Sequence, residues 1–582
     1  MPSFEVGESI PPNTAHAVSV SLPTWKSNIA YEEGEDWVVS RMAAGYPRFF
    51  IHKSIKQLES LIVEKHATAN QSAMLFPCSN AARRCQDFIL APNAGANVRV
   101  LDFRLHQEKN TSALLSRLMP TLSAVLFPTD LFPLAKQYWQ HTGDGISSRH
   151  AEFCTELLSN DLLTCAQQKQ QSTDTAVKPF RGPRRYQTES TTTVPSPPKS
   201  KPSPPPESQE STQFLEERFG RNLNVTLVGQ AKTAICRRIV GSITDPTPQE
   251  DGTTSPCTAC DNVYLFSGGM NAIFHTHRAL LDCRGAKKSV SFGFPYVDTL
   301  KVLQKFGPGC FFFGFASDSD LDKLEALLRG GEKILALFCE FPGNPLLVSP
   351  NLRKIRALAD EFDFAVVVDE TIGTFANVDV LQFSDVVVSS LTKIFSGESN
   401  VMGGCAILNP KSRYFEALKA SYGRVYEDTY WAEDIIFMER NSRDYRDRVD
   451  RVNANAELIC SVLQGNKHVK DLFYPKFSAS KANYDACRRP NGGYGGLLSV
   501  VFENAQQAEK FYDSMAIAKG PSLGTNFTLC SPYAILAHYT ELGWAAEYGV
   551  DANLVRISVG LEDKDELRET FQSALNAIDS SS

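Results

Sequence analysis

Three polar features follow apolar, strand-like runs in the second half of the chain. Lys393 lies in "SSLTKIFSGESNVMGG" after the run "FSDVVV", Asp369 ends "AVVVD", and "FSGGMNAIF" places residues 268–270 before a helical pattern. Ligands of open α/β sheets bind at the carboxyl ends of the strands, so we expect the three features to meet at one edge. An amine, an acid on a buried strand end and a glycine turn would then share one site.

This combination matches the needs of pyridoxal 5′-phosphate (PLP). The aldehyde needs an amine such as Lys393, and the ring nitrogen needs an anion such as Asp369 so that the ring stays an electron sink. The phosphate needs amides from residues 268–270 and hydroxyls from Ser390 and Thr392. Taken singly, the lysine could be a surface residue and the acid a helix cap, but their joint order favours the cofactor.

Alternating strand-like and helical runs predict the elements that hold these residues. "KILALF" precedes the helical pattern "PNLRKIRALADEFD", and "FAVVVDE" and "DVVVSS" follow. This order predicts the α/β class, with a parallel-rich sheet covered by helices. Beyond about Pro410, a long charged helix over 429–465 and the runs "GGLLSVVFE" and "LVRISVG" predict a smaller C-terminal α+β domain.

Composition divides the 582 residues into four parts. An N-terminal region (1–166) precedes a Pro-, Ser- and Thr-rich segment (167–213). That segment cannot bury enough apolar surface to offset its ordering entropy, so we expect a disordered linker. The PLP-binding domain is expected at 214–410 and the C-terminal domain at 411–582.

Charge and cysteine usage exclude several classes of protein. The net charge of −7, with acids and bases well mixed, gives no support for nucleic acid or an anionic membrane as partner. The start of the chain lacks the features of a signal peptide, and no run of about twenty apolar residues occurs. Fourteen scattered cysteines fit a reducing, cytoplasmic location. Cys257 and Cys260 lack a second ligand pair, so no metal is expected.

The lysine segment resembles the cofactor-lysine motif of the cystathionine γ-synthase family of cysteine and methionine metabolism enzymes. The shared pattern is Ser-x-Thr-Lys, then a glycine and later Gly-Gly, and the resemblance covers about residues 214–567. It implies a fold-type-I PLP-dependent transferase that acts on small molecules as a homodimer or homotetramer. The opening "PPNTAHAVSVSLPTW" and the long insert resemble the fungal members.

The resemblance implies a γ-replacement in transsulfuration and methionine biosynthesis. An O-acyl-L-homoserine, acetylated or succinylated, would react with L-cysteine to give L-cystathionine. Catalysis would use Lys393, covalently bound to the cofactor and moving protons, and Tyr296, stacked on the ring. The remaining implied contacts are those to the ring nitrogen (Asp369), the ring hydroxyl (Asn344), the phosphate (Gly269, Met270, Ser390 and Thr392) and the substrate (Arg556 at its α-carboxylate, and Ser522).

Two departures from the family pattern keep alternatives open. Val297 and Asp298 replace two glycines after the tyrosine, and Phe527 replaces a glutamate expected to touch the substrate pocket. A same-family enzyme that uses sulfide or a carbon nucleophile, or that catalyses γ-elimination, is one alternative. A regulatory or scaffold protein on the same fold is the other.

The family's Tyr-x-Arg, which reaches a neighbouring subunit's phosphate, has two candidates here. "GYPRFF" offers Tyr46 and Arg48, whereas "ERFGRNL" offers Phe219 and Arg221. Each precedes a helix-like stretch, a strand and a loop, which indicates a weak partial duplication. Chain order favours Arg221 as the phosphate ligand, and Arg48 is the alternative.

Overall fold

The largest sheet of the computed structural model is parallel-rich, as expected. The structure describes residues 5–47, 49–106, 115, 118–166, 227–243 and 260–580. Five neighbouring strands run parallel in the order β10-β9-β8-β6-β7, and β11 pairs antiparallel with β10 and β5 at the other side. The strands are β5 (Val263–Phe266), β6 (Ser289–Phe292), β7 (Cys310–Phe313), β8 (Ala336–Glu340), β9 (Ala365–Asp369), β10 (Val386–Ser389) and β11 (Gly404–Leu408).

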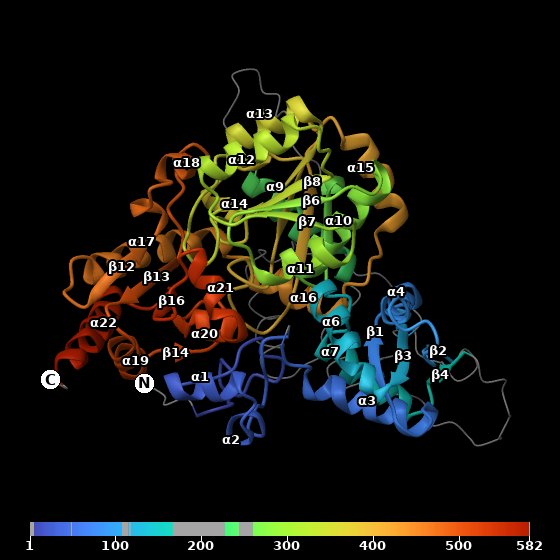
Figure 1. Ribbon diagram of the computed structural model, residues 1–582. Coiled ribbons are helices and arrows are strands. Elements are labelled where there is room, and N and C mark those ends of the chain that lie inside the picture. Colours follow the sequence, from blue (N-terminus) through green and yellow to red (C-terminus); the bar gives the residue numbers. More distant parts are fainter. Residues whose placement is uncertain are drawn as a thin grey trace, which may run out of the picture.

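Helices cover both faces of this sheet (Figure 1). Strand β9 shows why: Val367 faces the core formed with α10 and α15, whereas Val366 and Val368 face the larger core on the opposite side. A strand buried on both faces needs apolar residues throughout, which explains its continuous valine run. The helices of this domain are α9 (Val228–Ile243), α10 (Gly269–Arg284), α11 (Val297–Lys305), α12 (Asp318–Arg329), α13 (Leu352–Phe362), α14 (Thr374–Asn377) and α15 (Phe415–Val425).

The C-terminal α+β domain has a five-stranded sheet in the order β12-β13-β16-β15-β14. Its strands are β12 (Val469–Phe473), β13 (Leu497–Phe502), β14 (Ala518–Lys519), β15 (Leu529–Pro532) and β16 (Leu554–Ser558). Its helices are α18 (Lys481–Asp485), α19 (Ala505–Ser514), α20 (Tyr533–His538), α21 (Leu542–Glu547) and α22 (Lys564–Asp579).

The prediction of a single long helix over 429–465 is wrong. Two helices, α16 (Ala432–Asn441) and α17 (Tyr445–Leu463), are separated by a short break. The buried guanidinium of Arg448 accounts for the break, because it donates to the carbonyl of Asn441 at 3.0 Å and to that of Phe395 at 2.8 Å. The break therefore ties the end of α16 to the segment that follows Lys393.

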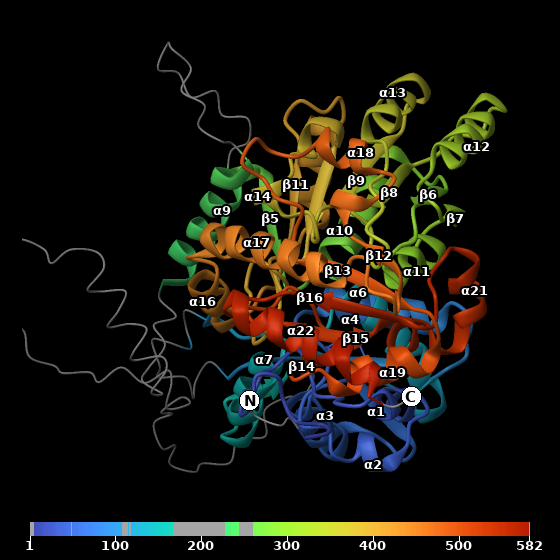
Figure 2. The same ribbon diagram turned by 90° about the vertical axis from the view of Figure 1, so that its left-hand side faces the viewer.

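The N-terminal region forms a third, antiparallel sheet in the order β1-β3-β2-β4. Figures 1 and 2 show this region (blue to cyan) along one side of the other two domains. Its elements are α1 (Trp25–Glu32), α2 (Asp36–Val39), α3 (Lys53–His66), β1 (Gln71–Phe76), α4 (Ser79–Leu90), β2 (Arg99–Leu105), β3 (Leu122–Pro128), α6 (Phe132–Thr142), α7 (Ser148–Ser159) and β4 (Leu163–Cys165).

A buried carboxylate, Asp144, joins the N-terminal region to α10. It pairs with Arg84 at 2.9 Å and accepts hydrogen bonds from Tyr138 (2.7 Å) and from Asn271 of α10 (2.7 Å), and it meets His275 of α10 at 3.1 Å. Burial alone would raise the pKa of this carboxyl, but the Arg84 guanidinium and the His275 contact hold it below its usual range. The acid is therefore ionised and fully paired.

Some expectations fall on residues that the structure does not describe. The linker at 167–213 and Cys257 both lie outside the described residues. Among the described helices, none has the length and apolarity needed to cross a bilayer. The cysteines of the described residues are free thiols.

Replacing Asp144 by Ala should lower the free energy of unfolding by about 3–5 kcal/mol, because Tyr138, Asn271 and His275 would lose their buried acceptor and Arg84 would keep only Glu427. Urea denaturation of the full chain measures the loss. Glu325→Ala, which removes an exposed ion pair with Arg329, is the control and should leave the free energy of unfolding nearly unchanged. Equal effects of the two substitutions would contradict the role of Asp144.

The Asp144 contribution should also depend on pH. A carboxyl with a lowered folded-state pKa stabilises the protein above its unfolded pKa, about 3.9, and loses that contribution as the pH falls. The difference between wild type and Asp144→Ala should therefore shrink below about pH 4. A difference that stays constant down to that pH would show that the ion pair is not its source.

Candidate active site

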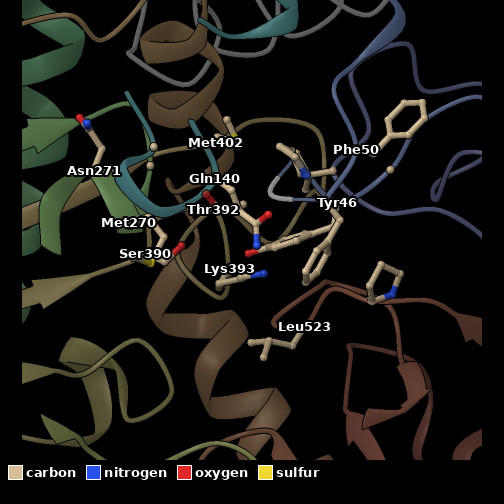
Figure 3. A pocket seen from close by; sticks show the side chains of 18 of the residues that line it. Tyr46, Phe50, Gln140, Met270, Asn271, Ser390, Thr392, Lys393, Met402 and Leu523 are labelled. Atoms are coloured by element: carbon tan, nitrogen blue, oxygen red, sulfur yellow. The ribbon is translucent and has the colours of Figure 1, made fainter. Parts of the chain in front are cut away.

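One cavity brings together most of the residues that the sequence analysis singled out. It lies at the carboxyl ends of β8, β9 and β10, and the N-terminal region and C-terminal domain close it (Figure 3). Ten of the predicted residues line it: Tyr46, Gly269, Met270, Tyr296, Asn344, Asp369, Ser390, Thr392, Lys393 and Arg556. The structure therefore brings these residues together in one cavity at the strand ends.

Lys393 lies at the centre of the cavity wall, with only 8% of its surface exposed. Its Nζ donates a hydrogen bond to Ser522 Oγ at 3.3 Å and lies 4.2 Å from the centre of the Tyr46 ring. Figure 3 shows Tyr46 and Lys393 pointing toward one another. Ser522 thus meets the lysine from behind the cavity surface, and the amine is held in one place by a hydroxyl and an aromatic face.

Two carboxylates end adjacent parallel strands beside this lysine. Asp369 and Glu340 are paired in the register of β9 and β8. Asp369 accepts from the amide and hydroxyl of Thr371 at 2.9 and 2.6 Å, and it forms no ion pair within the described residues. Burial raises its pKa, so the carboxylate needs a cation, and a pyridinium nitrogen supplies one.

The structure adds Glu340, which the sequence analysis did not assign to the site. Its carboxyl oxygens accept hydrogen bonds from the amides of Tyr296 and Asn344, at 2.5 and 3.1 Å. Burial and the neighbouring Asp369 raise the pKa of Glu340 to about 8. The side chain therefore fixes the two loops that carry the tyrosine and the asparagine. A strand-end acid next to Asp369 was the signal that could have identified it.

The glycine loop fits a phosphate. A Cβ on Gly269 would lie 2.8 Å from Ser390 Cβ, and one on Gly404 would lie 2.3 Å from the carbonyl oxygen of Gly268. Only glycines allow this close packing, which explains the paired glycines after Lys393. No side chain caps the first amides of α10, so they are available to an anion.

Thr392 holds the lysine segment in place. Its hydroxyl accepts from the amide of Gly403 at 3.0 Å and donates to the carbonyl of the same residue at 3.2 Å. The hydroxyl of Thr371 accepts from the amide of Ser390 at 2.8 Å. These bonds fix the backbone on both sides of Leu391 and so set the direction in which Lys393 leaves the strand.

Arg556 projects from β16 into the far side of the cavity. Its guanidinium donates to the carbonyls of Pro521 (3.1 Å) and Ser522 (3.0 Å) and to Asn344 Oδ1 (3.3 Å). The side-chain amide nitrogen of Asn344 also donates to the hydroxyl of Tyr533 at 3.3 Å. A buried guanidinium oriented by carbonyls is suited to bind a carboxylate.

The N-terminal region contributes a wall that the sequence analysis largely missed. The residues of this region that line the cavity include Gly45, Tyr46, Pro47, Phe49, Phe50, His52, Gln140, Gly143 and Arg149. Arg149 pairs with Asp434 of α16 at 2.9 Å, which fixes this wall to the catalytic half. The stretch "GYPRFF" indicated a candidate site residue because it matches the Tyr-x-Arg pattern. Gln140 and Arg149 lie on helices whose sequence pattern indicates no site.

Of the residues that depart from the family pattern, Val297 lines the cavity, and Asp298 and Phe527 have structural explanations. Asp298 is fully buried and meets His141 of α6 at 2.9 Å, so it docks the N-terminal region onto α11. Phe527 packs against Ile10, Ala518 and Leu529 and does not line the cavity. The expectation that Phe527 alters the substrate pocket is therefore wrong. Arg48 and Arg221 both lie outside the described residues.

Comparisons with known proteins place the chain in a family. Residues 255–576 match the model of the Cys/Met metabolism PLP-dependent enzymes, and residues 54–147 match the N-terminal domain of fungal trans-sulfuration enzymes. The chain belongs to the Cys/Met metabolism PLP-dependent enzyme family, so it is an enzyme whose cofactor is PLP.

Three relatives cover nearly the whole chain. A cystathionine γ-synthase of Neurospora crassa is 54% identical over 100% of both chains. One of Saccharomyces cerevisiae is 37% identical over 99% of both. A cystathionine γ-synthase-like enzyme of Amanita muscaria is 40% identical over 99% of this chain and 97% of its own.

Replacing Lys393 by Ala should abolish turnover and covalent cofactor attachment, because this is the lysine beside Asp369 and the glycine loop. Borohydride reduction of the PLP-loaded wild type, followed by peptide mapping, should place the pyridoxyl group on Lys393. Lys519→Ala is a matched control, because that buried lysine donates to Pro23 and Asp513 carbonyls elsewhere and should leave the label in place. A label on another lysine would contradict the assignment.

Proposed function

We propose that the protein joins an O-acyl-L-homoserine to L-cysteine to form L-cystathionine. The acyl group is acetyl or succinyl. The Cγ–O bond of the ester breaks, a Cγ–S bond forms, and the cysteine thiol proton leaves with the carboxylic acid. The observation that carries this proposal is the 54% identity to a cystathionine γ-synthase along the entire chain.

Lys393 moves protons in this proposal. Bound in the cavity, PLP supplies an electron sink for charge that develops at the substrate Cα. The Nζ of Lys393 takes the Cα proton and returns protons later, since it is the buried amine at this point of the wall. Asp369 would hold the ring nitrogen protonated and Tyr296 would stack on the ring, since both line the cavity.

Phosphate and substrate contacts follow from the positions of the remaining side chains. The amides of Gly269 and Met270, with the hydroxyl of Ser390, would bind the phosphate, and Thr392 would support them. Arg556 binds the substrate α-carboxylate as a bidentate partner, with Asn344 and Ser522 orienting it. The N-terminal wall excludes water from the reacting atoms.

A same-family enzyme with another nucleophile remains the second candidate, since the Amanita muscaria relative carries the designation "cystathionine γ-synthase-like". Two of the residues that favoured it no longer do so, because Phe527 lies away from the cavity and Asp298 serves docking, whereas Val297 lines the cavity. We also propose a reducing, cytoplasmic location, supported by the free thiols of the described residues, and a homodimer or homotetramer.

Product analysis tests the reaction. The purified PLP-loaded protein is incubated with O-acetyl- or O-succinyl-L-homoserine and either cysteine, sulfide or no nucleophile. We expect cystathionine from cysteine as the dominant product by mass spectrometry. Faster turnover with sulfide, or 2-oxobutanoate and ammonia formed equally well without a nucleophile, would replace the proposal with the second candidate.

We infer that Arg48, and not Arg221, binds the cofactor phosphate. Its neighbours Tyr46, Pro47 and Phe49 line the cavity that contains Lys393. Val228 and Lys232, which follow Arg221 along the chain, instead line a different cavity. This reverses the preference drawn from chain order.

Replacing Arg48 by Ala should therefore weaken PLP binding by about 2 kcal/mol, or roughly 30-fold, because a charge-assisted pair is lost. Arg221→Ala is the matched control and should leave the dissociation constant nearly unchanged. Titration of apo protein with PLP, followed by absorbance, gives both constants. The opposite pattern would restore Arg221 as the phosphate ligand.

A further inference from the structure

We infer that the N-terminal region is a degenerate second copy of the start of the PLP-binding domain, and that it completes the active site of its own chain as a built-in partner. The inference rests on the proposed role of Lys393. It makes Tyr46 a catalytic residue supplied in cis, and it leaves a second, inactive cavity as the counterpart of the first.

The local duplication predicted from the sequence has a structural counterpart. In the first copy α3 leads to β1, a short loop and α4; in the second, α9 leads to β5, a short loop and α10. "LFPCSNAA" and "LFSGGMNA" occupy the same place between strand and helix. The similarity is confined to this start, because β1 lies in an antiparallel sheet of four strands whereas β5 borders the larger sheet.

The two copies face each other through matched helices. Helices α4 and α6 come from the first copy and α10 and α11 from the second, and α6 packs against both α10 and α11. Phe88 of α4 stacks on Phe306 at the end of α11, with ring centres 5.1 Å apart, and Tyr138 of α6 meets Phe274 of α10 at 6.3 Å. Helix facing helix in this way resembles an isologous interface between subunits, formed here within one chain.

Two cavities flank this interface in a reciprocal way. The cavity with Lys393 combines the strand–helix loop of the second copy, residues 267–270, with Tyr46 from the segment that enters α3 of the first. The other cavity combines the strand–helix loop of the first copy, including Cys78 and Asn80, with Val228 and Lys232 at the start of α9 in the second. Each copy thus contributes to both cavities, as partners related by a two-fold axis do.

The second cavity cannot bind a phosphate in the same way. Cys78 and Ser79 replace the glycines, and the Cys78 thiol donates to Glu427 at 3.4 Å. Burial alone would raise the pKa of Glu427, but its hydrogen bonds with Arg84 lower it, so a carboxylate occupies this end of α4. Lys232 is paired with Asp428. One competent site per chain is therefore expected.

Tyr46 is the contact through which the first copy acts on the chemistry. Its ring lies over Lys393 Nζ at 4.2 Å, so it touches the reacting atom. The segment that carries it is bonded into the same chain: His52, at the start of α3, contacts the Ala15 carbonyl at 2.9 Å, and the Val18 amide donates to the Ser399 carbonyl at 2.8 Å. No second chain is needed to bring this residue to the lysine.

Complementation between two variants tests cis completion. Lys393→Ala and Tyr46→Ala chains with different tags are co-expressed, and tandem purification isolates any hetero-oligomer in the PLP-loaded state. In cis, no chain of that oligomer has an intact site, so its activity should not exceed that of the Tyr46→Ala protein alone. In trans, one of every two sites would be intact, and activity would return to about half of wild type.

Cofactor binding gives a readout that does not depend on turnover. Borohydride can fix PLP only on the Tyr46→Ala chain of the hetero-oligomer, so its PLP dissociation constant belongs to that chain. We expect this constant to be raised above that of wild type, to the value measured for the Tyr46→Ala homomer. The Tyr46→Phe protein should have a constant nearer that of wild type, because the ring remains. A wild-type constant in the hetero-oligomer, or wild-type constants and activity in Tyr46→Ala itself, would overturn the inference.

The outcomes separate this inference from the proposed reaction. Wild-type protein that binds one PLP per chain but makes no cystathionine would defeat the proposed function and leave the binding test intact. If no hetero-oligomer forms and the wild-type chain is active as a monomer, the site is complete in cis. Restored activity in the mixed oligomer, with cystathionine made by wild type, would defeat only the cis assignment.

Discussion

The structure depends on one buried ionic contact, Asp144 with Arg84, His275 and Asn271. The carboxylate belongs to the N-terminal region, and two of its partners belong to the first turns of α10. Helix α10 begins at the glycine loop, so this contact fixes the loop and the N-terminal wall relative to each other. The desolvation free energy of the buried carboxylate is offset only when every partner is present. The contact therefore favours this one placement of the N-terminal region against α10.

From this arrangement the chemistry of the cavity follows. Strand ends deliver two adjacent acids and one lysine, and among the described residues of the catalytic half the cations that line the cavity are this lysine and Arg556. Asp369 needs a positive ring nitrogen, while Glu340, with its raised pKa, holds two loops through their amides. The positive ring nitrogen of PLP would supply the cation that the Asp369 carboxylate needs. Binding of PLP is therefore coupled to the order of the surrounding loops.

Much of this could be predicted from the sequence, because buried parallel strands leave a strong signal. The valine runs located β9 and β10, and their ends located Asp369 and Lys393. The break between α16 and α17 was missed because it depends on Arg448 bonding to distant carbonyls. The wall formed by Gln140 and Arg149 was missed for the same reason, since tertiary contacts leave no local periodicity. Phe527 was misplaced because spacing after a motif does not fix a side-chain direction.

The N-terminal region forms part of the cavity that contains Lys393. Hydrogen–deuterium exchange of the full-length apo protein, with and without added PLP, tests it most directly. Backbone amides of residues 45, 46, 49 and 50 and of 267–271 should both gain protection when PLP binds, because these residues line the same cavity. Protection confined to 267–271, with exchange at 45, 46, 49 and 50 unchanged, would contradict the account.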